Sequence, residues 1–84
     1  MASVEKLIAA FLACRNTYPY NDFKRILGRL GYREVKRGKT GGSRRRFYNQ
    51  QIDHILMFHE PHNGEMARGM VKRLREELEA KGLI

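Results

Sequence analysis

The chain has 84 residues, 42% hydrophobic and 31% charged, and its 17 Lys and Arg against 9 Asp and Glu give a net charge of +8. This length predicts one domain with a small core and argues against a large internal cofactor pocket, while the composition argues against a disordered chain. The single cysteine, Cys14, excludes an intramolecular disulfide and a cysteine-rich metal site. No apolar run reaches the roughly 20 residues of a membrane-spanning helix, and Glu5 and Lys6 interrupt the one run that resembles a secretion signal. We therefore expect a cytoplasmic protein that needs no cofactor or metal and does not enter a membrane.

Two helices are predicted in the first third of the chain. Ser3 is a suitable cap for a helix that runs to about Cys14, because the apolar residues between them recur at helical spacing. A second helix begins at Asn21 or Asp22 and ends at Gly31, a residue that readily adopts the left-handed conformation of a helix end. The apolar face of this second helix is formed by Phe23, Ile26, Leu27 and Leu30.

Three strands are predicted next, because β-favouring segments alternate with short turns. The strands cover Tyr32–Arg37, Ser43–Tyr48 and Ile52–His59. The turns between them are Gly38–Gly42 and Asn49–Gln51. Such short connections between consecutive strands predict an antiparallel meander.

A last helix is predicted from about Glu65 to Lys81, with Gly82 as its stop. The resulting order, helix, helix, three strands and helix, predicts an α+β domain. We expect a three-stranded antiparallel sheet with helices packed on one face and the other face open. Residues 1–20 are expected to form an N-terminal helical extension, and residues 21–84 the main domain.

The positive charge is concentrated in the middle of the chain. Residues 24–46 contain ten Lys and Arg and one acidic residue, Glu34, and such a cluster attracts polyanions. Because side chains alternate along a strand, Phe47 is expected to face the core while Arg44, Arg46 and Tyr48 share the opposite face. Two guanidinium groups and an aromatic ring favour the binding of RNA phosphates and a stacked base. The alternative is a solvated strand whose charges only deter aggregation.

Further basic residues are assigned to the same RNA-binding surface. Lys36, Arg37 and Lys39 lie in and around the glycine-rich turn, and Arg68 lies near the start of the last helix. The turn can bring backbone N–H groups close to a phosphate. It lacks the full pattern of a nucleotide-binding phosphate loop, and a plain hairpin is the simpler interpretation.

Two histidines, His59 and His62, flank the turn that leads into the last helix. Histidine is the usual proton carrier near neutral pH, so this pair beside Arg44 and Arg46 supplies the parts that RNA cleavage needs. The alternatives are a structural role in the turn and, less well supported, a metal site with Glu60. His54 is interpreted as a surface residue.

Several segments, in this order, resemble the HicA family of bacterial toxins. They are the helix of residues 21–32 that ends in Leu30-Gly31-Tyr32, the strand from Gly42-Ser43 to Phe47, the His59-x-Pro61-His62-Asn63-Gly64 segment, and the C-terminal segment from Leu78 to Ile84. Together they span Phe23 to Ile84. The resemblance implies a double-stranded-RNA-binding-domain-like fold and a ribosome-independent mRNA interferase neutralised by a HicB-type antitoxin.

One position departs from the family pattern. In the family the catalytic histidine follows Gly-Ser, and Arg44 stands at that position here. Three interpretations follow: catalysis has moved to His59 or His62, the chain binds RNA without cutting it, or it acts mainly as a regulator with a partner.

The main hypothesis is an mRNA endoribonuclease toxin, and the alternative is a non-catalytic RNA-binding or regulatory module. An acidic antitoxin that covers the basic surface is compatible with both. A DNA-binding regulator is less well supported, because strands follow the helix that carries Lys24, Arg25 and Arg29 where a second helix would be needed.

Overall fold

The computed structural model describes residues 3–35 and 44–84. The elements of this part are α1 (Val4–Ala13), β1 (Tyr18–Pro19), α2 (Tyr20–Leu30), β2 (Tyr32–Glu34), β3 (Arg44–Asn49), β4 (His54–His59), β5 (Glu65–Met66) and α3 (Arg68–Ala80). The strands β2, β3 and β4 form an antiparallel sheet in that order, so the predicted meander and the α+β class are confirmed. The expected turn Gly38–Gly42 lies outside the described residues.

The first helix forms as its sequence predicts. The Ser3 side chain accepts a hydrogen bond from the backbone N–H of Lys6 at 3.3 Å and so caps α1. Leu7 and Phe11, one helical turn apart, are the buried residues of this helix. The helix ends at Ala13, and Cys14 has an extended backbone.

The second helix starts earlier than predicted. It begins at Tyr20 because Pro19 occupies the N-cap position, and because the N–H of Tyr20 donates to the carbonyl of Gly64 at 2.9 Å. Asn21 and Asp22 therefore lie inside the first turn. At the other end Gly31 has the expected left-handed conformation, with φ of 103°.

The start of the last helix was predicted wrongly. Glu65 and Met66 are extended and pair with Pro19 and Tyr18 as a second, two-stranded sheet, so α3 begins only at Arg68. Met66 is fully buried, which favours the extended conformation that points its side chain into the core. At the end of α3 the predicted stop is confirmed, because Gly82 has a φ of 72°.

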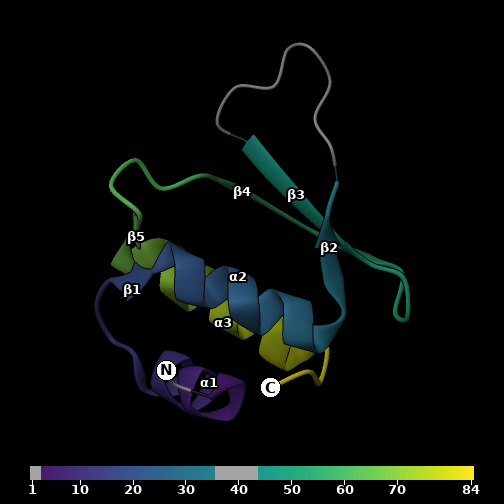
Figure 1. Ribbon diagram of the computed structural model, residues 1–84, viewed down its shortest axis with the longest axis horizontal. Helices are drawn as coiled ribbons and strands as arrows, with labels where there is room; N and C mark the ends of the chain where they lie inside the picture. Colours follow the sequence, from purple (N-terminus) through teal and green to yellow (C-terminus); the bar gives the residue numbers. More distant parts are fainter. Residues whose placement is uncertain (1–2, 36–43) are drawn as a thin grey trace.

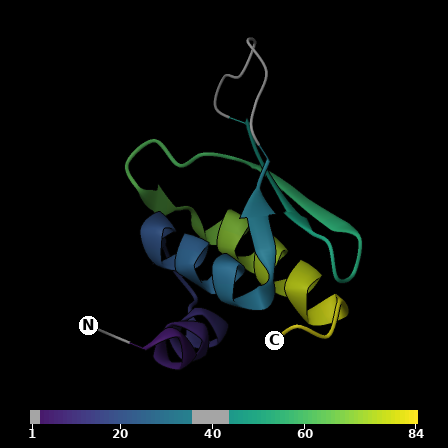
Figure 2. The same cartoon turned by 45° about the vertical axis from the view of Figure 1, so that its right-hand side comes forward.

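The sheet, the pair of helices α2 and α3, and α1 lie one above the other (Figures 1 and 2). The helices α2 and α3 cover one face of the sheet, and α1 packs on their far side. Leu7 and Phe11 of α1 belong to the same hydrophobic core as the sheet residues Phe47, Leu56 and Phe58. No element within residues 3–35 and 44–84 covers the other face of the sheet.

The interpretation of His54 as a surface residue is wrong. Its side chain is only 13% exposed and joins three elements. One ring nitrogen, Nδ1, lies 2.7 Å from the Tyr32 hydroxyl of β2, and the other, Nε2, lies 2.9 Å from a carboxylate oxygen of Glu77 on α3. His54 thus ties both outer strands of the sheet to the last helix.

A second buried polar side chain, Asn49, anchors the end of β3. It is fully buried, and its amide donates to the carbonyl of Leu30 at 3.0 Å while its oxygen accepts from the N–H of Gln51 at 3.0 Å. This residue was predicted to open a turn, but it continues the strand. The turn instead extends to Asp53, whose φ is 51°, and so β4 begins at His54, two residues later than predicted.

Candidate nucleic-acid interface

The uncovered side of the three-stranded sheet, which we call the outer face, is cationic with an apolar centre. The register pairs Arg33 with Tyr48, Arg46 with Met57 and Arg44 with His59, so these side chains point the same way. Ile55 and Met57 lie between the charged groups and are 47% and 50% exposed. The outer face comprises Arg33, Val35, Arg44, Arg46, Tyr48, Ile55, Met57 and His59.

The tyrosine of the outer face is held in place at one end. The Tyr48 hydroxyl donates to Asp53 at 2.9 Å, and this hydrogen bond raises the pKa of Tyr48 above its usual value. Tyr48 is only partly buried, and it lies between Arg33 on β2 and Ile55 on β4. An aromatic ring beside an arginine is suited to stacking on a base while the guanidinium group contacts a phosphate.

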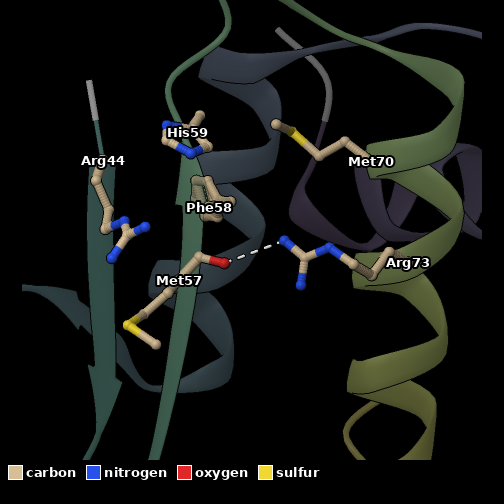
Figure 3. A pocket seen from close by; sticks show the side chains of 6 residues that line it. All are labelled: Arg44, Met57, Phe58, His59, Met70 and Arg73. Atoms are coloured by element: carbon tan, nitrogen blue, oxygen red, sulfur yellow. Dashed lines mark hydrogen bonds between the residues drawn. The ribbon is translucent and has the colours of Figure 1, made fainter.

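Among the described residues, Arg44 and His59 bring a predicted binding residue and a predicted catalytic residue together. They are direct cross-strand partners at the open end of β3 and β4, where facing side chains have Cβ atoms about 5 Å apart. Both line a pocket of about 390 Å³ together with Met57, Phe58, Met70 and Arg73. Figure 3 shows Arg44 and Arg73 on the two sides of β4, each with its guanidinium group turned toward that strand.

Arg73 was not predicted as a site residue. Its guanidinium donates to the carbonyl of Met57 at 3.0 Å and lies 3.5 Å from Glu77, so α3 contacts the free edge of β4 here. The helical pattern predicts the last helix, but it does not say which flank of the helix faces the sheet. Arg33 was also missed, although the alternation of β2 against Tyr32, which is buried, indicates that it faces outward.

The second predicted histidine lies in an adjoining pocket. His62 lines a hollow of about 320 Å³ together with His59, Glu60 and Met70, among other residues of the segment 59–67. His59 and Met70 line both pockets. The two histidines therefore share one hollow, and His59 also shares one with Arg44.

A network of charges holds the end of β4. Arg45 lies on the same side of β3 as Phe47 and is hydrogen-bonded to Glu60 and, at 3.0 Å, to Glu34. The hydrogen bond to Glu60 raises the pKa of Arg45, so this residue stays charged. The network ties the segment after His59 to β2 and β3.

The remaining predicted binding residues are not on the described outer face. Lys36, Arg37 and Lys39 lie outside the described residues. Arg68 lies on α3 and lines a different pocket, together with Cys14, Arg15, Gly69, Lys72 and Arg75.

Two general features of the described residues bear on the class of site. Within them, no group of three His, Cys, Asp or Glu side chains is arranged to hold a metal ion. No helix there has the length and apolar character needed to cross a membrane.

Comparison with known families gives a match over most of the chain. A family model for the HicA toxin of bacterial toxin–antitoxin systems matches residues 20–80. The chain belongs to the HicA toxin family. The resemblance seen in the sequence is thereby confirmed, as is the fold that it implies, similar to a double-stranded-RNA-binding domain. Membership makes this HicA-family chain a toxin with an antitoxin partner, and the helix α1 precedes the matched residues. No curated protein and no solved structure matches the chain.

Proposed function

We propose that this HicA-family toxin is an mRNA endoribonuclease that binds RNA on the outer face of its sheet and cleaves it at His59. The observation that carries the proposal is the cross-strand pair of Arg44 and His59. It places a permanent cation and a proton carrier on one pocket at the end of an exposed cationic surface.

Binding is assigned to the arginines and the tyrosine of the outer face. Arg33, Arg44 and Arg46 project from two neighbouring strands and supply planar guanidinium groups for phosphates. Tyr48 supplies a ring for a base. This surface contacts the phosphate backbone of the RNA more than the edges of its bases. We therefore expect RNA binding with a weak sequence preference and a strong dependence on salt.

Cleavage is assigned to general acid–base chemistry around His59. His59 removes the proton from a 2′-hydroxyl, whose oxygen attacks the adjacent phosphorus and forms the new P–O bond. The P–O5′ bond breaks, and His62 donates a proton to the leaving oxygen, which yields a 2′,3′-cyclic phosphate and a 5′-hydroxyl. Arg44 and Arg73 neutralise the charge that develops on the phosphorane. The step consumes no co-reactant.

A second candidate function is an RNA-binding or regulatory module that does not cleave. The observation that favours it is Arg44 itself, which follows Gly42-Ser43 where the resembled family has its catalytic histidine. On this account the outer face keeps its affinity for RNA, and the protein acts together with its antitoxin.

We assign the antitoxin to the HicB type and its binding surface to the outer face. Ile55 and Met57 are apolar and exposed among arginines, which suits an acidic partner with apolar anchors. Such a partner blocks RNA by occupying the same surface. Because the proposed target of the toxin is mRNA, we expect the toxin to act in the cytoplasm.

The test is an incubation of the purified protein with a long unstructured RNA in EDTA, analysed on denaturing and native gels. We expect cleavage by the wild type, with His59→Ala slowing the reaction about 100-fold or more while the RNA is still retained on the native gel. Cleavage that is unchanged in both His59→Ala and His62→Ala overturns the assignment of the site. A native-gel shift of intact RNA by the wild type supports the non-catalytic module.

A further inference from the structure

We propose that a second RNA-binding site lies between α3 and the segment that follows α1, where it binds backbone phosphates of an RNA strand that has passed the edge of β4. This inference rests on the proposed binding of RNA to the outer face and extends it. The site is a pocket of about 460 Å³ lined by Cys14, Arg15, Arg68, Gly69, Lys72 and Arg75. Four of these six residues are cations: Arg15 follows the end of α1, and Arg68, Lys72 and Arg75 lie on α3.

The four cations of this pocket form no ion pair with the described residues. Among the described residues, no carboxylate lies within ion-pair distance of any of the four. Arg75 donates to the carbonyl of Cys14 at 2.8 Å, and Arg15 donates to the same carbonyl at 3.0 Å. The carbonyl contacts fix two guanidinium groups side by side without cancelling their charge. Placing like charges together in this way is unfavourable unless an anion binds between them.

The spacing along α3 suits a chain of phosphates better than a single small anion. Arg68, Lys72 and Arg75 stand at positions i, i+4 and i+7, which places them on one stripe of the helix. At 1.5 Å per residue this stripe is about 10 Å long, enough to contact more than one phosphate of a strand. Gly69 leaves open space beside the stripe, because, apart from its chain neighbours and the backbone of its own helix, no described atom lies within 4 Å of where a Cβ would stand.

Arg73 lies between the outer face and the stripe on α3. Arg73 shares a pocket with Arg44 and His59 at the free edge of β4, and Lys72 is its neighbour in the helix. Successive helical residues are about 100° apart, so the cations of α3 lead from the β4 edge toward α1. A strand leaving His59 along Arg73 therefore reaches Lys72 and Arg68 next.

The chemistry of the pocket favours RNA over a protein partner. Protein interfaces are built around apolar anchors, and the exposed large apolar residues of the described chain are Val35, Ile52, Ile55 and Met57. All four lie on the sheet strands or the turns between them, and none lies on α1 or α3. The pocket offers four cations, which is what a phosphate backbone requires.

Two variants test the site. Arg68→Gln/Lys72→Gln removes two exposed cations. Gly69→Glu places a carboxylate beside the cations of the pocket. Position 69 lies in the first turn of α3, where an acidic residue stabilises the helix, so loss of folding is not expected. Gly28→Glu is the matched control, because Gly28 is also an exposed helical glycine with open space around it and lies outside the pocket.

The measurement is the affinity for two single-stranded RNAs as a function of salt. One RNA is too short to leave the outer face, and the other is longer than the 36 Å extent of the molecule. We expect Arg68→Gln/Lys72→Gln to weaken binding of the long RNA about tenfold or more and to reduce its salt slope by about 1.4, since each phosphate contact contributes about 0.7. Gly69→Glu is expected to weaken the long RNA as well, while binding of the short RNA stays within twofold.

The outcomes separate this inference from the proposed function. If Arg44→Gln/Arg46→Gln abolishes binding of both RNAs while the pocket variants behave like Gly28→Glu, the outer face binds RNA and the second site is wrong. If the wild type binds neither RNA, the proposed function fails and this inference fails with it. Normal RNA binding by the pocket variants, combined with a loss of affinity for an acidic polypeptide, assigns the pocket to a protein and overturns the proposal.

Discussion

Arg44 of β3 lies directly opposite His59 of β4, at the open end of the sheet and on its uncovered face. The pair combines a guanidinium cation with an imidazole, a side chain that can both accept and donate a proton. A phosphate held by Arg44 is therefore next to a group able to move a proton.

The first prediction concerns the charge at position 44. Arg44→Gln should slow RNA cleavage about 100-fold, because it removes a cation that faces the reacting phosphate. Arg44→Lys should recover part of this loss, since it restores the charge but not the two-pronged geometry of guanidinium. Single-turnover rates at saturating RNA measure both effects. Equal rates for the wild type and Arg44→Gln would show that Arg44 takes no part in the reaction.

The second prediction concerns the contact of His54 with Tyr32 and Glu77. His54→Ala should lower the free energy of unfolding by about 2 kcal/mol, because it breaks two partly buried hydrogen bonds, one of them to a carboxylate. Urea denaturation measures the change. His62→Ala is the control, because His62 is exposed and its loss should change stability by less than about 0.5 kcal/mol. Similar losses for the two variants would show that His54 does not hold the sheet to α3.

The third prediction concerns Asn49, the buried residue that ends β3. Asn49→Ala should cost about 1–3 kcal/mol, since the carbonyl of Leu30 and the N–H of Gln51 both lose their partner. Gln50→Ala, at the exposed neighbouring position, should be nearly neutral. Thermal unfolding measures the stability of both variants. An Asn49→Ala protein as stable as the wild type contradicts the proposed role of Asn49 in anchoring the end of β3.

The fourth prediction concerns alkaline pH. Burial raises the pKa of Tyr18, Tyr20 and Tyr32 from 10.0 to about 12. Between these two pH values the folded chain holds protons that the unfolded chain has released, so the free energy of unfolding falls as the pH rises. Below pH 10 this contribution is fully present. Urea denaturation at stepped pH should show the decline, and Tyr18→Phe should reduce its slope. A flat profile across this range contradicts the burial of these hydroxyls.

The sequence predicted those parts of the fold that depend on local periodicity. The spacing of apolar residues predicted the three helices, and Gly31 and Gly82 predicted two helix ends. The alternation of side chains along β3 predicted that Arg44, Arg46 and Tyr48 share one side. These features depend on neighbours within a few residues, and so a single sequence reveals them.

The features that were missed depend on contacts between distant segments. The pairing of Tyr18 with Met66 spans most of the chain and uses two residues per strand, too few to leave a pattern. His54 gave no sign of its partners because Tyr32 and Glu77 are more than twenty residues away in either direction. Arg73 became a site residue only through the packing of α3 against the edge of β4.

The most direct test of the central claim is the rate at which His59→Ala cleaves an RNA that it still binds, measured under single-turnover conditions in EDTA. The account predicts wild-type affinity with a rate lowered about 100-fold or more, and wild-type products that end in 2′,3′-cyclic phosphate. A His59→Ala protein that cleaves at the wild-type rate would contradict the account and place the chemistry elsewhere on the molecule.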